Sequence, residues 1–169
     1  VAEPHNLAKG WVGFDFQRAF GCPVKVINDA AMQALGSYRG GTMLFLGLGT
    51  GLGACLVIDG TVVPLELGHL SIGKEKKTFE DDLGVQGLER LGKKKWRKCV
   101  ELATERFVSA LLLDDVVLGG GNAKLLTRLP KGCRMGDNAN AFLGGFRLWA
   151  DSNPIRRESR DGRKLKRTP

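Results

Sequence analysis

Hydrophobic residues along the chain form short continuous runs and longer stretches in which they recur every three or four positions. Short apolar runs bounded by glycine or Asn/Asp indicate buried strands, and the longer periodic stretches indicate helices. The expected strands are 24–27, 42–48, 54–58, 61–63 and 115–118. The expected helices are 7–20, 29–36, 86–113 with a break near Gly92, one that starts at Asn122, and 139–149. Strands that alternate with helices predict an α/β fold.

A glycine-rich loop follows the strand expected over 42–48. It contains Gly49, Thr50, Gly51 and Gly53. Without side chains, backbone N–H groups can approach and surround an anion, and the Thr50 hydroxyl adds a donor, so a phosphate site is one interpretation. A tight hairpin that needs positive φ angles is the other. The loop joins strand to strand, and it matches neither the P-loop nor the dinucleotide-binding pattern.

A second glycine run comprises Gly119, Gly120 and Gly121 and is followed by Asn122. It lies between an expected strand and an expected helix, where a helix N-terminus favours negative charge. A nucleotide or a phosphate chain could bind there, although a plain strand-to-helix turn accounts for the same three glycines.

Asn28 and Asp29 come directly after an expected strand and start an expected helix. A carboxylate in this place could accept the proton of an alcohol that attacks a phosphoryl group. The alternative is helix capping, for which both residue types are suited.

Glu66 and His69 are three residues apart, with Gly68 between them. A carboxylate paired with an imidazole offers the mixed donors and acceptors that sugar hydroxyls need. The alternative is a solvated pair at a surface turn. The spacing does not match the zinc-binding H-E-x-x-H pattern, so no metal ligation is expected.

The order of these four segments resembles the ROK family of sugar kinases and repressors. The segments 26–35, 45–53, 91–96, 119–123 and 144–149 are closer still to the polyphosphate glucokinases. The resemblance implies an actin-like ATPase (ribonuclease H-like) fold. It assigns 1–40 to a remnant of the N-terminal lobe, 41–149 to the C-terminal lobe and 150–169 to a basic disordered tail.

The same resemblance implies phosphoryl transfer from polyphosphate or ATP, with Mg²⁺, to the 6-hydroxyl of glucose. Asp29 would be the catalytic base, and Asn28, Glu66 and His69 would hold the other sugar hydroxyls. The first glycine loop would hold the donor phosphates, and Gly119 to Asn122 would lie at the nucleotide or polyphosphate end. The run Lys93–Lys95 either helps to bind a long polyanion or is a solvated helix start.

The sequence departs from the family pattern in two places. No cysteine occurs in 70–84, where many ROK proteins carry a zinc motif, so zinc is not expected. Only 27 residues precede Asn28, so the first phosphate loop of the family is not found and kinase activity is expected to be impaired. An incomplete sheet would leave an exposed edge, which predicts a homodimer. The alternatives are a non-catalytic sugar-binding ROK-type protein and an inactive remnant.

Composition argues against a membrane protein, a secreted protein and a nucleic-acid-binding protein. No apolar run reaches the length of a membrane span, and residues 1–20 do not resemble a secretory signal, so a cytoplasmic protein is expected. Cys22, Cys55, Cys99 and Cys133 form no C-x-x-C pair. The net charge is +8, but seven Lys/Arg against three Asp/Glu place +4 of it in 151–169, so specific nucleic-acid binding is not expected.

Overall fold

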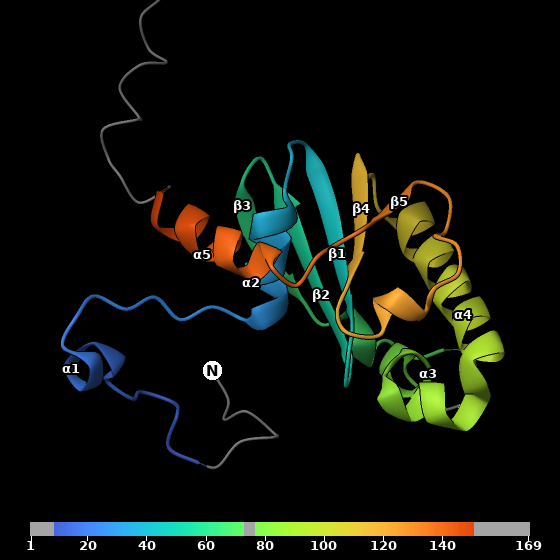
Figure 1. Ribbon diagram of the computed structural model, residues 1–169, viewed down its shortest axis with the longest axis horizontal. Helices are drawn as coiled ribbons and strands as arrows, with labels where there is room; N and C mark the ends of the chain where they lie inside the picture. Colours follow the sequence, from blue (N-terminus) through green and yellow to red (C-terminus); the bar gives the residue numbers. More distant parts are fainter. Residues whose placement is uncertain (1–8, 73–76, 151–169) are drawn as a thin grey trace, which may run out of the picture.

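The computed structural model describes residues 9–72 and 77–150 (Figure 1). Its centre is one five-stranded sheet with the order β3-β2-β1-β4-β5. The strands are β1 (Thr42–Leu48), β2 (Leu52–Ile58), β3 (Thr61–Leu65), β4 (Asp115–Gly119) and β5 (Cys133–Met135). The first three form an antiparallel meander, while β4 pairs parallel with both β1 and β5. The predicted α/β class is confirmed.

The central strand β1 is buried on both faces because helices cover each side of the sheet. Leu44 and Leu46 point into one hydrophobic cluster, and Met43 and Phe45 belong to the cluster on the opposite face. All four side chains are buried. This explains why the strand has a continuous apolar sequence rather than an alternating one.

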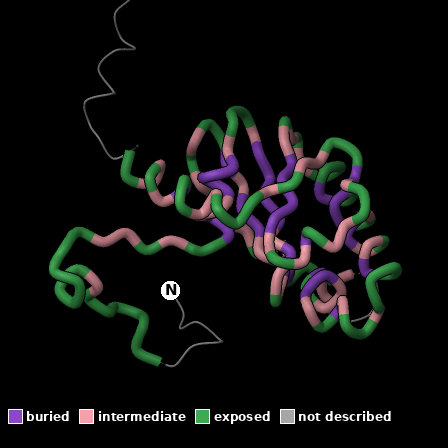
Figure 2. Tube along the Cα trace, viewed as in Figure 1, coloured by how far each residue is buried: buried purple, intermediate pink, exposed green. Residues whose placement is uncertain are grey.

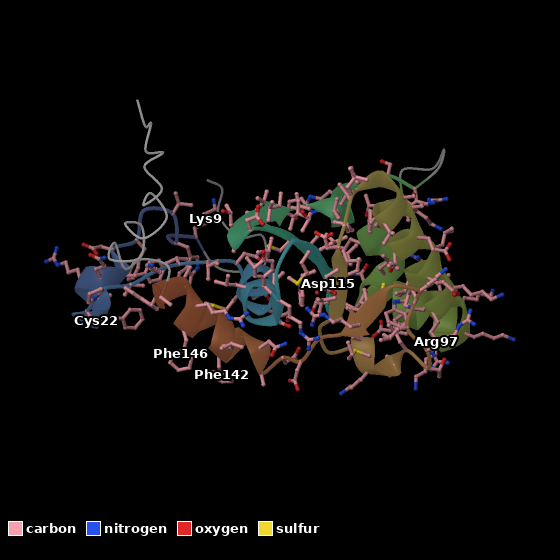
Figure 3. All side chains as sticks on the ribbon, turned by 90° about the horizontal axis from the view of Figure 1, so that it is seen from above. Lys9, Cys22, Arg97, Asp115, Phe142 and Phe146 are labelled. Carbon is pink, nitrogen blue, oxygen red and sulfur yellow. The ribbon has the colours of Figure 1, made fainter. Side chains whose placement is uncertain are left out.

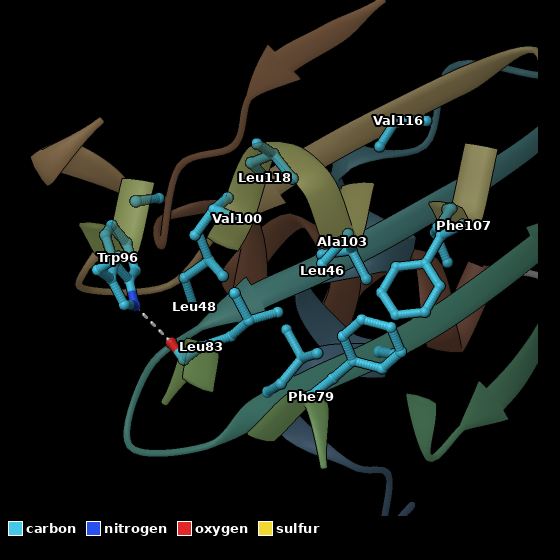
Figure 4. Packing of buried hydrophobic residues seen from close by; sticks show 14 residues of the cluster. Leu46, Leu48, Phe79, Leu83, Trp96, Val100, Ala103, Phe107, Val116 and Leu118 are labelled. Carbon is cyan, nitrogen blue, oxygen red and sulfur yellow. Dashed lines mark hydrogen bonds between the residues drawn. The ribbon is translucent and has the colours of Figure 1, made fainter. Parts of the chain in front are cut away.

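Helices α3 (Phe79–Leu83) and α4 (Val85–Ala110) cover the first face. Trp96 is fully buried there and donates from its indole Nε1 to the Leu83 carbonyl oxygen at 2.9 Å, which joins the two helices (Figure 4). The expected break near Gly92 is confirmed, since Gly92 has φ 70° and ψ 159° within α4. The short helix α3 and strand β5 were not predicted.

Helix α2 (Asp29–Ser37) covers the other face, and α5 (Asn140–Ala150) packs against α2. Two glycines allow this close approach, because a Cβ on Gly36 would overlap the backbone of Asn140 and one on Gly144 would overlap the backbone of Met32. Arg147 donates to the carbonyl oxygens of three residues at the C-terminal end of α2, Leu35, Gly36 and Tyr38.

Two predictions for the N-terminal segment are wrong. Of the helix expected over 7–20, the described residues 9–20 are helical only over α1 (Phe16–Phe20), because Gly10 and Gly13 adopt positive φ angles that interrupt a helix. The strand expected over 24–27 is not formed, and this segment is not part of the five-stranded sheet. Figure 2 shows that the segment carrying α1 is largely exposed and lies beside the main body.

The helix expected from Asn122 is only a single 3₁₀ turn, η2 (Ala123–Leu125). Arg97 donates to the Leu125 carbonyl oxygen at 2.7 Å, and this bond replaces the next helical one. Pro130 further disfavours helical geometry in the residue before it. The basic tail expected over 150–169 lies outside the described residues, apart from Ala150. Within the described ranges, no helix is both long and apolar enough to cross a membrane.

Candidate active site

The two glycine segments meet at one edge of the sheet because β1 and β4 are parallel neighbours. Gly47 in β1 is in register with Gly119 in β4. Asn122 then crosses to the first loop, where its backbone N donates to the Leu48 carbonyl oxygen at 2.9 Å and its Nδ2 donates to the Gly49 carbonyl oxygen at 3.1 Å. The carboxyl end of parallel strands is where α/β proteins commonly bind ligands.

The first glycine loop is a three-residue connection between β1 and β2. The Gly49 N–H bonds to the Gly51 carbonyl oxygen at 3.1 Å. The N–H groups of Thr50 and Gly51 make no hydrogen bond with the described part of the chain. These two groups are therefore available to an anion.

The loop is a tight hairpin between the antiparallel strands β1 and β2, as one of the two interpretations held, but none of its glycines has a positive φ, so the backbone reason given for them is wrong. Close packing explains two of them instead. A Cβ on Gly53 would lie 2.9 Å from the Ala30 Cβ, and one on Gly51 would overlap the Glu80 carboxylate. The small residues thus let α2 and α3 approach the loop.

Helix α2 places Asp29 at this edge. Asn28 caps the helix, since its Oδ1 accepts from Ala30 N at 2.9 Å and from Ala31 N at 3.2 Å. Asp29 lies in the first helical turn with its side chain exposed, where the helix dipole favours a negative charge. Asn28 therefore has the capping role that the sequence left open. Asp29 Oδ1 also accepts from Ala30 N at 2.8 Å, and Asp29 lines the cavity at this edge.

Glu66 immediately precedes the 3₁₀ turn η1 (Leu67–His69), which follows β3, and His69 is its last residue. The His69 N–H bonds to the Glu66 carbonyl oxygen at 3.1 Å, and both residues are exposed. Gly68 between them is buried, and a Cβ there would lie 3.0 Å from the Leu52 carbonyl oxygen. The turn is therefore held close to β2.

Glu80 is a residue of this site that the sequence interpretation missed. Its Oε2 accepts a hydrogen bond from Leu52 N at 3.1 Å, so it lies directly beside the glycine loop. A signal was present, because Thr78 and Asp81 form a capping box that starts α3 and places Glu80 in its first turn.

A cavity of about 350 Å³ connects these elements. Seven of the predicted site residues line it, namely Asp29, Gly49, Thr50, Gly51, Gly53, Glu66 and Gly120. The other five are not in its lining: Asn28, His69, Gly119, Gly121 and Asn122. Gly121 lines a neighbouring cavity of about 260 Å³, and Gly120 belongs to both. The second glycine run therefore separates two adjoining hollows.

The lining of the main cavity is acidic. It includes the carboxylates of Asp29, Glu66 and Glu80 but neither Lys nor Arg. Gln33 also lines it, with a buried Oε1 that has no partner among the described residues. A phosphate group in this cavity would therefore need a cation to offset charge repulsion.

Comparisons with known proteins agree with a phosphate-binding role for this site. No family model matches the chain. It is 27% identical to a polyphosphate glucokinase of Mycobacterium tuberculosis over 129 residues, which is 69% of this chain and 49% of that protein. It is 23% identical to the polyphosphate glucokinase of Mycobacterium leprae, covering 73% of this chain and 42% of that one. The chain spans about half the length of these curated relatives.

A solved structure supports the same relationship. The inorganic polyphosphate/ATP-glucomannokinase of an Arthrobacter strain superposes with a TM-score of 0.73 at 26% identity, covering 89% of this chain and 68% of that one. The chain is therefore similar to polyphosphate-dependent sugar kinases, and it shares the fold of ROK family proteins. A ROK family glucokinase of Streptomyces griseus, solved with glucose and AMPPNP, shares the fold with a TM-score of 0.63 at 15% identity over 78% of this chain and 70% of that one. The predicted actin-like ATPase fold of this family is confirmed.

Proposed function

We propose that this chain carries the acceptor and donor sites for phosphoryl transfer from polyphosphate or ATP to the 6-hydroxyl of glucose. One observation carries the proposal: Asp29 and the glycine loop line the same cavity. A candidate base and candidate phosphate ligands therefore face one space. The names of the relatives support glucose, polyphosphate and ATP as the substrates.

Asp29 is the proposed base that accepts the proton of the attacking hydroxyl, whose oxygen then bonds to the terminal phosphorus of the donor. The bridging P–O bond of the donor breaks, and the donor leaves one phosphate shorter, as ADP or a shortened polyphosphate. Glu66 lines the cavity and would accept from neighbouring sugar hydroxyls. Asn28 precedes Asp29, and His69 is three residues after Glu66; both would contact the sugar although neither lines the cavity in the structure. The N–H groups of Thr50 and Gly51 would donate to phosphate oxygens of the donor.

Mg²⁺ fits this lining. It typically binds one or two protein carboxylates together with substrate phosphates and water, and Glu80 would supply such an oxygen, since Asp29 and Glu66 are assigned to the sugar. In the described part of the chain, no group of three or more His, Cys, Asp or Glu is placed to hold a metal ion alone. The donor phosphates would therefore complete the site, and the cation would offset charge on the transferred group.

The test is a coupled assay for glucose 6-phosphate with the purified chain, glucose, Mg²⁺ and either polyphosphate or ATP. Turnover that disappears when Mg²⁺ is chelated supports the proposal. Because the chain covers about half of its curated relatives, binding and chemistry should be measured separately. Calorimetric titration with glucose supplies the binding measurement, and absence of both binding and turnover would contradict the proposal.

The non-catalytic alternative is a sugar-binding protein of the same fold. A ROK family transcriptional regulator also superposes, with a TM-score of 0.61 at 17% identity over 78% of this chain. Glucose binding without turnover under any donor would favour this alternative. We also propose a cytoplasmic location, as expected from the sequence. Free cysteines are typical of that compartment, and Cys22, Cys55, Cys99 and Cys133 are all free.

A further inference from the structure

A third hollow lies between α4 and the segment that follows η2. Its volume is about 170 Å³, and Leu126 and Pro130 form part of its wall. Three basic residues, Arg97, Lys98 and Arg128, line it with a single acidic residue, Glu101. Figure 3 shows Arg97 at the end of the molecule opposite Cys22. This cationic hollow contrasts with the main cavity, whose lining contains carboxylates and no basic residue.

The cations of this hollow are partly pre-positioned. Arg97 is held by the bond from its Nε to the Leu125 carbonyl oxygen, and the remaining guanidinium nitrogens make no hydrogen bond with the described residues. Arg128 pairs with Glu101 at 2.8 Å, but its side chain is 80% exposed. Lys98 is exposed and has no ion pair within the described ranges. The hollow therefore retains excess positive charge and free donors.

Further cations extend from this hollow in two directions. The exposed run Lys93–Lys95 precedes Arg97 on α4. Lys124 in η2 lines the 260 Å³ cavity, which shares Gly120 with the main cavity. Lys124 is two residues before Leu126 in the chain, so basic residues occur both beside the glycine edge and in the hollow.

We propose that this hollow binds phosphate groups of an inorganic polyphosphate chain away from its transferred end. The inference rests on the proposed function, since it extends the donor site. An Arg fork and two exposed cations suit the repeated oxygens of such a chain. A second anchor raises the apparent affinity for long donors through effective concentration, while a donor too short to reach it gains nothing.

The test uses Lys98→Gln combined with Arg128→Gln, two exposed substitutions that should leave the fold intact. Calorimetric titration with long-chain polyphosphate should show about tenfold weaker binding and a salt dependence reduced by about 1 to 2 in slope, since two released counterions are lost. Binding of pyrophosphate should not change. Arg39→Gln, an exposed charge outside the hollow, is the matched control and should bind as the unmodified chain does.

Glu101→Gln supplies a test of opposite sign. Removal of the single negative charge should tighten binding of long polyphosphate by about two- to threefold. The proposal is overturned if the double variant binds long polyphosphate as Arg39→Gln does, or if Glu101→Gln weakens binding. A single-stranded oligonucleotide of equal charge that binds as tightly, with the same loss in the double variant, would also overturn it in favour of nucleic acid. If the variants change polyphosphate binding as predicted but the chain shows no turnover of glucose, only the proposed function is contradicted.

Discussion

Asn122 Nδ2 donates to the Gly49 carbonyl oxygen at 3.1 Å, although the two residues are 73 positions apart. The bond fixes one glycine segment relative to the other at the shared edge of β1 and β4. Without this bond, only the bond from Asn122 N to the Leu48 carbonyl oxygen would join Asn122 to this part of the chain, within the described residues. The geometry of the proposed donor site therefore depends on a side chain outside the cavity lining.

Replacement of Asn122 by Ala should lower the free energy of unfolding by about 1 kcal/mol, the typical contribution of one such hydrogen bond. It should also raise the KM for the phosphate donor more than the KM for glucose, because the loop loses its fixed position. Urea unfolding and initial-rate kinetics measure the two effects. Asn138→Ala, at an exposed position, is the control; equal effects of both substitutions would contradict this explanation.

Gly120 and Gly121 form a matched pair for testing the second glycine run. Gly120 has φ 84°, and a Cβ there would lie 2.5 Å from the Leu48 carbonyl oxygen, whereas Gly121 has open space around it. Gly120→Ala should therefore destabilise the fold by about 1 to 3 kcal/mol, while Gly121→Ala should change it by less than about 0.5 kcal/mol. Thermal melting of both variants tests this, and a reversed order would contradict the described backbone.

Arg147 should be important for the attachment of α5 to α2. Its Nη1 donates to three backbone carbonyl oxygens at the end of α2. Because hydrogen bonds from a charged donor are stronger than neutral ones, Arg147→Ala should cost about 2 kcal/mol of stability. Denaturant unfolding measures the loss. Arg39→Ala is the control for removal of a positive charge, and a similar loss in that variant would assign the effect to net charge.

Alkaline pH should destabilise the fold through two thiols, the buried Cys55 and the partly buried Cys133. Burial raises the pKa of the Cys55 thiol from 9.0 to about 11, and burial likewise raises the pKa of Cys133 to about 11. In the unfolded chain both thiols ionise near pH 9, so the folded state holds more protons between pH 9 and 11. Their stabilising contribution is complete below pH 9 and is lost as the pH rises through 11.

Unfolding experiments at several pH values measure this effect. Cys55→Ala should reduce the slope of stability against pH between pH 9 and 11, because one of the two thiols is removed. Reaction of the folded chain with a thiol reagent at neutral pH supplies a second check. Cys22 is exposed and should react first, and equally fast modification of the buried Cys55 would contradict its described environment.

Local pattern predicted most of the sheet but not the segments that depend on tertiary contacts. β1 was predicted with its observed bounds because a strand buried on both faces has a continuous apolar sequence. Val24–Ile27 has the same local character, but strand formation needs a partner, which sequence pattern alone does not specify. Glu80 was missed because its proximity to Leu52 N arises from the packing of α3 against β2.

Only part of the candidate site could be predicted, because the lining of a cavity also depends on tertiary contacts. The order of the motifs indicated which segments should meet, and the pairing of β1 with β4 brings the two glycine segments to one edge. It did not indicate which residues line the cavity. Asn122 donates to the Gly49 carbonyl oxygen of the loop, and Asn28 uses its Oδ1 to cap α2. Neither residue is in the lining.

The central claim is that Asp29 is the base of a phosphoryl transfer site, and Asp29→Asn tests it most directly. Glucose 6-phosphate formation with polyphosphate and Mg²⁺ should be compared with that of the unmodified chain and of Asp15→Asn, an exposed carboxylate that caps α1. The account predicts a loss of turnover of about 100-fold or more in Asp29→Asn, with glucose affinity changed by less than about threefold and no loss in Asp15→Asn. Turnover retained in Asp29→Asn, or lost equally in both variants, would contradict it.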